Sequence, residues 1–338
     1  MELISWNNWE EKNNNVNQHI QRYQDIIKSA VEDFVRANPT SALYAPINYM
    51  MALKAKRWRP MLLLATAEGY GAKTNEAIDA ALAVEVFHNF TLMHDDIMDN
   101  APLRRGQPTV HETWSVNASI LSGDAMMVQA FQLLEKSHPT HLPYLLKVFN
   151  KTAIEVCEGQ QLDMDFEQRI DVTLDEYREM IRLKTSVLLA AAMKMGAICG
   201  NADAFQQELA YSFGEHFGLA FQLRDDYLDV FGDPGEFGKQ DAGDILADKK
   251  TFLYLSALNA QNGAYRDELL KWQGPQNSQQ KIEAVRNIFR ASSADEATLE
   301  EMASHVVSAR QALNQMEIGS EIQAFFHQLL EVVQTRTV

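Results

Sequence analysis

The chain contains little cysteine, which argues against a disulfide-stapled scaffold and against a structural zinc site. Its 338 residues include 2 cysteines, Cys157 and Cys199. Neither lies in a CxxC pair or a Cys/His run, so the spacing does not suit zinc. The sequence leaves a disulfide open, but we expect two buried free thiols, as in proteins of reducing compartments.

Long hydrophobic runs are also absent. The most apolar stretch, residues 187–193, meets Lys194 and is far shorter than the ~20 residues needed to cross a bilayer. The N-terminus lacks the basic and apolar regions of a signal peptide. We therefore expect no membrane span and a cytoplasmic protein.

Positive charge is scarce. Lys and Arg number 30 against 46 Asp and Glu, which gives a formal net charge of -16. An acidic surface argues against nucleic acid as a partner, and it makes any local basic cluster more informative. No P-loop or GxGxxG pattern is present, so a bound phosphate would not be held by a glycine-rich loop.

Strand-like alternation is rare, whereas helical periodicity covers most of the chain. Several apolar segments have lengths that suit helices and are apolar on more than one face, as inside a large bundle. The sequence therefore predicts an all-α fold, with residues 1–338 forming a single helical domain. The segments are residues 43–68, 76–99, 118–135, 143–165, 174–199, 204–231 and 248–260.

Two acidic clusters share the pattern DDxxD. On a helix, positions i and i+4 lie on one face, and like charges at that spacing weaken the helix. Both clusters end long apolar helices, where an uncompensated carboxylate is costly. Cations would remove both penalties, and carboxylate oxygens suit Mg2+, which usually shares itself with a phosphate. The acidic residues are Asp95, Asp96 and Asp99 in the first cluster and Asp225, Asp226 and Asp229 in the second.

A polar seam leads to each cluster along an otherwise apolar helix. His88 and Thr91 precede Asp95 at helical spacing, and Gln222 precedes Asp225. Such seams usually face a water-filled functional cavity. The alternative is that the clusters are simply acidic residues at two solvent-exposed helix ends. The pairing of two seams with two clusters favours the cavity.

Basic residues accompany both clusters. Arg presents a planar fork to phosphate oxygens, and Lys acts as a point charge. Each one alone would be read as a surface charge, but together they predict a site for magnesium and polyphosphate. They are Lys56, Arg59, Arg104, Arg105, Lys184, Lys239 and Lys249.

These features in this order resemble the trans-isoprenyl diphosphate synthases, also called polyprenyl synthetases. The resemblance implies an all-α bundle of roughly ten or more helices around a central active-site cavity, usually in a homodimer. It also implies head-to-tail condensation of isopentenyl diphosphate with an allylic diphosphate (dimethylallyl, geranyl or farnesyl). The matching stretches are residues 56–60 (KRWRP), 85–106 (EVFHNFTLMHDDIMDNAPLRRG), 184–185 (KT), 218–229 (GLAFQLRDDYLD) and 238–251.

The resemblance also implies roles for individual residues in a site that holds three Mg2+ ions. Asp95 and Asp99 would hold two ions on the allylic diphosphate, with Asp96 in support. Asp225 would hold the third, with Asp226 and Asp229 in its outer shell.

The implied substrate contacts fall into four groups. Arg104, Lys184 and Lys239 would grip the allylic diphosphate, and Lys249 would close its far end. The isopentenyl diphosphate would lie against Lys56, Arg59, His88 and Arg105. Thr185 and Gln222 would face the developing allylic cation.

Two aromatic side chains are candidates for the floor that limits product length. Phe90 and Phe87 precede Asp95 by roughly 7–8 Å and roughly 12 Å at ~1.5 Å per residue. Short-chain members of the family carry an aromatic at the position of Phe90, which favours a C20 (geranylgeranyl) product over a C15 (farnesyl) product. The alternative is that both rings are ordinary core residues.

The chain departs from the family pattern at Lys54-Ala55, where Gly-Gly is frequent, which puts the carry-over of Lys56 and Arg59 in doubt. Three other functions stay open at this point. A class I terpene cyclase shares the first cluster but does not need a second DDxxD or the basic residues of a second diphosphate. A non-catalytic subunit would typically lack a cluster, and an acidic metal-binding protein leaves the basic residues unexplained.

Overall fold

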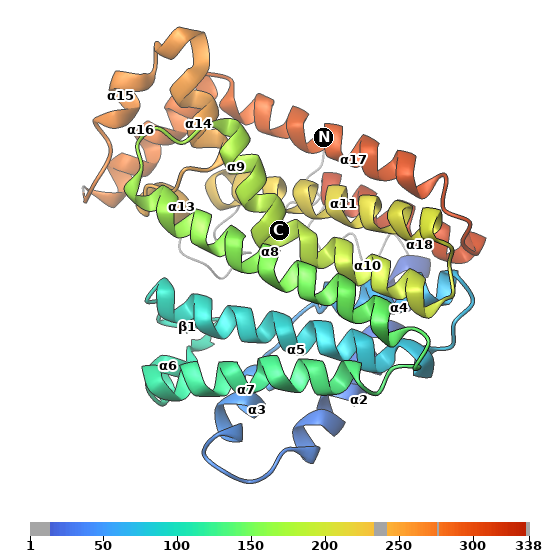
Figure 1. Cartoon of the computed structure of the whole chain (residues 1–338). Coiled ribbons are helices and arrows are strands. Elements are labelled where there is room, and N and C mark those ends of the chain that lie inside the picture. Colours follow the sequence, from blue (N-terminus) through green and yellow to red (C-terminus); the bar gives the residue numbers. More distant parts are fainter. Residues whose placement is uncertain (1–13, 233–241, 276, 336–338) are drawn as a thin grey trace.

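The computed structural model describes residues 14–232, 242–275 and 277–335, and this part of the chain is almost entirely helical (Figure 1). Long helices run roughly parallel to one another through the body of the molecule, and short helices cluster at one end. The predicted all-α class is confirmed. The helices of the first half are α2 (Asn14–Ala37), α3 (Tyr44–Ala52), α4 (Trp58–Gly69), α5 (Thr74–Met98), α6 (Val110–Thr113), α7 (Val116–Leu134) and α8 (Leu142–Gln168).

The second half begins with α9, the π-turn η1 and α10, which follow one another without a break. A long helix, α11, comes next, and the short helices precede the final pair. The elements are α9 (Leu174–Ile181), η1 (Arg182–Ser186), α10 (Val187–Cys199), α11 (Ala204–Phe231), α13 (Gly243–Leu246), α14 (Phe252–Asn259), η2 (Ala260–Gly263), α15 (Arg266–Leu270), α16 (Ser278–Ala291), α17 (Ala294–Leu313) and α18 (Ser320–Thr335).

The centre of the core is α10, in which every residue except Lys194 is buried. It packs against α4 and α11. Glycines allow this approach: a Cβ on Gly214 would lie 2.7 Å from Ala190 Cα, and one on Gly196 would lie 2.3 Å from the Leu63 carbonyl oxygen. The helix that carries the second acidic cluster is therefore held directly against the core.

Local side-chain chemistry sets the start of the helices that carry the site. The side chain of Asp203 accepts a hydrogen bond from the Gln206 N–H and caps α11. Thr173 and Glu176 form a capping box at the start of α9. Thr251 caps α14 through the N–H of Tyr254.

Two of the predicted helical segments are not single regular α-helices, and one of them, residues 174–199, contains the π-turn η1. Residues 43–68 form α3 and α4 as separate helices, because the chain turns at Arg57, whose φ of 52° is left-handed. Neither Lys54 nor Ala55 has a positive φ. Replacing Gly-Gly by these residues therefore adds no left-handed strain at either position.

A short hairpin returns the chain beneath the end of α5. Strands β1 (Leu103–Arg104) and β2 (Gln107–Pro108) pair antiparallel. Arg105 and Gly106 have φ values of 54° and 75°, the left-handed pair that a tight two-residue hairpin turn needs. The hairpin places Arg104 next to the first acidic cluster and Arg105 beside Asn89.

The two cysteines are free thiols, as expected. Cys199 is buried, but Cys157 is exposed, so the prediction that both are buried was wrong. Cys157 lies on the outward face of α8, one position after the buried Val156. Within the described residues, no helix combines the length and the apolar character that a bilayer crossing requires.

Candidate active site

The first acidic cluster lies at the C-terminal end of α5 and is paired with cations from two other elements. Arg104 of the hairpin donates to Asp96 at 2.8 Å and to Asp95 at 3.3 Å. Lys184 of η1 donates to Asp95 at 3.2 Å and to Asp163 of α8 at 2.6 Å. The structure thus brings α5, the hairpin, η1 and α8 together at the first acidic cluster.

Burial sets the charge balance of this cluster. The Asp96 side chain is 1% exposed, and its Oδ2 atom is buried without a hydrogen-bond partner. Burial raises the pKa of Asp96, while Arg104 opposes the rise. Burial would lower the pKa of Lys184, but Asp95 and Asp163 outweigh it and raise the pKa. The cluster therefore carries a buried oxygen that a cation could satisfy.

The second cluster lies on α11, and Asp226 is its most enclosed member. Its carboxylate accepts hydrogen bonds from the Tyr177 hydroxyl and, at 2.8 Å, from the Gln222 amide. Gln222 in turn accepts from the Thr185 hydroxyl at 3.0 Å. Burial and then the neighbouring charge of Asp244 raise the pKa of Asp226 to about 8.

A cavity of about 610 Å³, here called the acidic cavity, opens against this cluster. Lys184 lines the cavity and also bonds Asp95, so it connects the two acidic clusters. Lys249 also lines the cavity and interacts electrostatically with carboxylates of both clusters. Partial desolvation would lower its pKa, but carboxylates that include Asp99 of the first cluster and Asp226 of the second raise it. The cavity wall includes Asp163, Tyr177, Lys184, Thr185, Gln222, Asp225, Asp226, Asp229, Asp244 and Lys249.

The π-turn η1 is what points Lys184 and Thr185 into this site. A π-turn adds a residue to a helical turn and is frequent at functional sites. Gly159 of α8 lies directly against the π-turn, because a Cβ on Gly159 would come 2.3 Å from the backbone nitrogen of Lys184. On the opposite side, a Cβ on Gly218 would come 2.7 Å from Ser186 Cα. The turn is therefore wedged between two helices.

A second cavity of about 780 Å³, here called the basic cavity, lies among α2, the segment between α3 and α4, and α5. Arg59 contacts the His88 ring at 3.0 Å between Nη1 and Nε2. Arg57 donates to Glu85 at 3.2 Å, and Asn89 donates to the same carboxylate at 3.0 Å. The lining includes Lys54, Lys56, Arg57, Arg59, Glu85, His88 and Arg105.

Positive charge is concentrated at depth in the basic cavity. Burial, followed by Arg105 and opposed by Glu85, lowers the pKa of Arg59 to about 10. Burial and the charges of Arg59 and Arg105 lower the pKa of His88 well below its ordinary value. Arg59 Nε is also buried without a hydrogen-bond partner. Such a recess is suited to an anion with several oxygens.

The acidic residues fit Mg2+ by the chemistry of their donors, which are all hard carboxylate oxygens. Across the described ranges, no three His, Cys, Asp or Glu side chains form a preformed metal centre. Mg2+ usually binds through one or two carboxylates and keeps waters or phosphate oxygens. Asp226 has both oxygens in hydrogen bonds, which suits the predicted outer-shell position.

The structure brings most of the predicted site residues together around two cavities rather than one. One group lies at or beside the acidic cavity and consists of the two acidic clusters with Arg104, Lys184, Thr185, Gln222 and Lys249. The other group lines the basic cavity and consists of Lys56, Arg59, His88 and Arg105. Lys239 lies outside the described residues. Phe87 and Phe90 are buried, with ring centroids 5.6 Å apart, and Phe87 contacts Phe149 of α8.

Several residues of the site were missed by the sequence reasoning. Asp163 and Tyr177 contact Lys184 and Asp226, and Asp244 donates its N–H to Asp229 at 2.9 Å. Glu85 and Asn89 support the arginines of the basic cavity. Glu85 could have been found, because it extends the polar seam of α5 by one turn, and Asn89 follows Glu85 at the i+4 position. Tyr177 gave no such signal, since a lone tyrosine on a helix is usually core.

Comparison with known proteins agrees with this geometry. The family described as Polyprenyl synthetase matches residues 40–291. A geranylgeranyl diphosphate synthase of Methanosarcina mazei is 38% identical over 278 residues, which cover 82% of this chain and 85% of the relative. A short chain isoprenyl diphosphate synthase of Methanothermobacter thermautotrophicus is 34% identical and covers 88% of this chain and 92% of its own length.

Solved structures give the same answer. A crystal structure of a geranylgeranyl pyrophosphate synthase superposes with a TM-score of 0.90 at 44% identity, covering 94% of this chain and 99% of the other. One from Pyrococcus horikoshii Ot3 has a TM-score of 0.88 at 30% identity, with coverages of 95% and 99%. These relatives do not favour a terpene cyclase or a non-catalytic subunit. The chain belongs to the polyprenyl synthetase family and is a prenyltransferase of the short-chain type.

Proposed function

We propose that this protein condenses isopentenyl diphosphate with an allylic diphosphate, head to tail, to give a short-chain trans-prenyl diphosphate and pyrophosphate. The reaction depends on Mg2+, with three ions expected when diphosphate is bound. The observation that carries the proposal is Lys184, which bonds Asp95 of the first cluster and lines the cavity of the second. It ties both acidic clusters to one chamber.

The allylic diphosphate is assigned to the acidic cavity. Asp95, Asp99 and Asp225 would hold the ions, with Asp96, Asp226 and Asp229 in support. Bound Mg2+ would neutralise charge on the departing pyrophosphate. Arg104 and Lys184 now pair with carboxylates, and they would exchange these partners for phosphate oxygens once cations compensate the aspartates.

Thr185 and Gln222 are assigned to stabilise the allylic carbocation. The oxygens of Thr185 and Gln222, which are hydrogen-bonded to each other, would face the allylic carbon as its C–O bond breaks. The double bond of isopentenyl diphosphate then attacks this carbon, and a proton is lost to the bound pyrophosphate. Apolar core side chains exclude the water that would capture the cation.

The isopentenyl diphosphate is assigned to the basic cavity. Arg59 and Arg105 would bind its phosphate oxygens, with Lys56 at the rim and His88 orienting Arg59. The assignment is supported by the unpartnered Arg59 Nε and by the depth of positive charge. Lys239, outside the described residues, stays a prediction for the allylic diphosphate.

We assign a C20 product, with C15 as the alternative, on the position of Phe90. Relatives are named as geranylgeranyl and also as geranylfarnesyl diphosphate synthases, so this assignment rests on the aromatic floor. We also propose a homodimer, supported by exposed apolar side chains on α7 and α8. The cytoplasmic location and the single-domain organisation stay predictions from the sequence.

The experiment is incubation of the purified protein with labelled isopentenyl diphosphate and each of the dimethylallyl, geranyl and farnesyl diphosphates, with and without Mg2+. We expect chain growth to C20 that stops when Mg2+ is chelated. Absence of chain growth with every starter would overturn the proposed function.

A further inference from the structure

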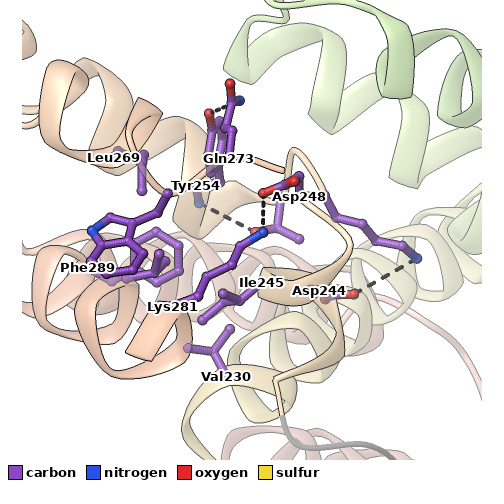
Figure 2. A pocket seen from close by; sticks show the side chains of 13 residues that line it. Val230, Asp244, Ile245, Asp248, Tyr254, Leu269, Gln273, Lys281 and Phe289 are labelled. Carbon is purple, nitrogen blue, oxygen red and sulfur yellow. Dashed lines mark hydrogen bonds and ion pairs between the residues drawn. The ribbon is translucent and has the colours of Figure 1, made fainter. Parts of the chain in front are cut away.

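A buried lysine lies directly behind the wall of the acidic cavity. Lys281 of α16 is 2% exposed and is surrounded by apolar side chains, among them Val230, Ile245 and Phe289 (Figure 2). Isolated charges are very unfavourable in such surroundings unless they are paired. The space left between these side chains is about 20 Å³, so Lys281 has little room for another arrangement.

The ammonium group of Lys281 has one acceptor in the turn that follows α13 and one in the segment before α16. It donates to Asp248 Oδ1 at 2.7 Å and to the Gly274 carbonyl oxygen at 3.1 Å. The other carboxylate oxygen of Asp248 accepts from the Gly274 N–H at 2.8 Å. The three residues form a closed ring, which joins the turn to α16 and to the segment before it.

Asp248 holds a backbone conformation that needs support. Its φ is 53°, in the left-handed region that L-residues with a side chain seldom adopt. Asp248 lines both the small cavity around Lys281 and the acidic cavity. The ring with Lys281 and Gly274 fixes the side chain of this strained residue, so the direction of the next residue is fixed as well.

That next residue is Lys249, which reaches into the acidic cavity. Its N–H donates to the Asp244 carbonyl oxygen at 3.0 Å, and its ammonium lies 3.9 Å from the Asp244 carboxylate. Asp244 is anchored to the second cluster through Asp229. One short turn therefore carries Asp248, which pairs with the buried Lys281 (Figure 2), and Lys249, which lines the acidic cavity.

We propose that Lys281 and Asp248 are positioning residues that hold Lys249 against the diphosphate in the acidic cavity. The inference rests on the proposed function, because the diphosphate is the group that Lys249 would meet. Neither residue is assigned to contact substrate. Lys281 acts through Asp248, and Asp248 acts through the backbone of the turn.

The test compares Lys281→Met, Asp248→Gly and the double variant with the wild-type enzyme. Each single variant should lower kcat about tenfold, with a smaller change in KM for isopentenyl diphosphate. The melting temperature should fall most in Asp248→Gly, since it leaves a buried lysine unpaired. In the double variant the melting temperature should recover, because no unpaired charge remains, while kcat should stay low.

Recovery of kcat together with the melting temperature would overturn the proposal, because the pair would then serve stability alone. Asp248→Asn should retain an acceptor for the Gly274 N–H and fall between wild type and Asp248→Gly in kcat. As a matched control, Lys194→Met removes a partly buried lysine that pairs with Glu208 away from both cavities. This control should leave kcat within twofold of wild type.

A second experiment tests whether the effect of Lys281 on kcat passes through Lys249. In a Lys249→Ala background, Lys281→Met should change kcat less than twofold, because its effect passes through Lys249. An undiminished tenfold effect in that background would reject the route through Lys249. Calorimetry of pyrophosphate binding with Mg2+ should show weaker binding for Lys281→Met. An inactive wild-type enzyme would instead reject the proposed function.

Discussion

At the scale of single residues, the site is a set of charges held out of water and balanced against one another. Arg104 and Lys184 compensate carboxylates of the first cluster, and Arg59 stays charged beside a histidine that is kept neutral. Each of these groups has a partner that a diphosphate or a cation could replace. The described structure therefore represents a closed charge network that substrate is expected to reopen.

His88 predicts a pH dependence of stability. Its Nε2 accepts from Arg59, and its pKa in the folded protein lies well below the ordinary 6.5. As pH falls below about 6.5, the unfolded chain takes up a proton that the folded protein does not, so stability is lost in that range. We expect His88→Gln to reduce the loss in unfolding free energy between pH 7.5 and 5.5 by up to about 1 kcal/mol.

Thermal unfolding of both proteins across this pH range makes the measurement. His138→Gln, in a different cleft beside His141, serves as the control and should follow the wild type. A His88→Gln profile that parallels the wild type would show that His88 titrates normally.

Much of the site could be predicted at this scale, because the acidic clusters and most of the basic residues are arranged by short-range helical spacing. Asp163 and Tyr177 were missed, since they reach the site from α8 and α9 by packing that no local pattern encodes. The pairing of Asp248 with Lys281 was missed for the same reason, as these residues belong to different elements.

At the scale of helices and turns, function depends on where regular structure is interrupted. The sequence predicts one helix over 174–199, but the chain inserts η1 there, and the insertion aims Lys184 and Thr185 at the cavity. Periodicity could not reveal it, because a π-turn leaves the apolar pattern on both sides intact. The break before α4 was missed likewise, since it depends on a left-handed Arg57.

Gly159→Ala tests the role of η1. The added methyl group would lie 2.3 Å from the backbone nitrogen of Lys184, so the π-turn must shift. We expect a loss of about 1–3 kcal/mol in stability and a decrease in kcat larger than the decrease in folded fraction. Gly319→Ala, where a Cβ meets nothing within 4 Å, is the control. Normal kinetics for Gly159→Ala would mean that the position of η1 is not critical.

Phe90→Ala tests the floor formed by the aromatic cluster between α5 and α8. Phe90 packs on Phe87, which packs on Phe149. Removing the ring should open the channel and lengthen the product, as chromatography of the dephosphorylated alcohols would show. Phe326→Ala, which truncates a buried ring elsewhere, should destabilise the protein without changing chain length. An unchanged product distribution for Phe90→Ala would identify Phe90 as ordinary core.

At the scale of the whole molecule, the outer surface of α7 carries more apolar side chains than a solvated helix needs. Leu121 and Val128 are 61% and 58% exposed and lie seven residues apart, so they share a face. Ile154 of α8 is 61% exposed. A face of this kind is typical of a protein interface, which agrees with the proposed homodimer.

Light scattering tests this prediction. The wild-type protein should have the mass of a dimer, and the double variant Leu121→Asp and Val128→Asp should shift toward the monomer. The control Arg266→Asp, which changes an exposed residue of α15, far from α7, to the same charge, should stay dimeric. A monomeric wild-type protein at micromolar concentration would contradict the homodimer.

The central claim is that two acidic clusters close on one diphosphate through Mg2+ in a shared chamber. Calorimetry with an allylic thiolodiphosphate, which carries the diphosphate but ionises poorly, measures this directly. We predict binding that requires Mg2+ and that is weakened at least tenfold by either Asp95→Asn or Asp225→Asn. Binding that persists without Mg2+, or that is indifferent to one of the clusters, would contradict the shared site.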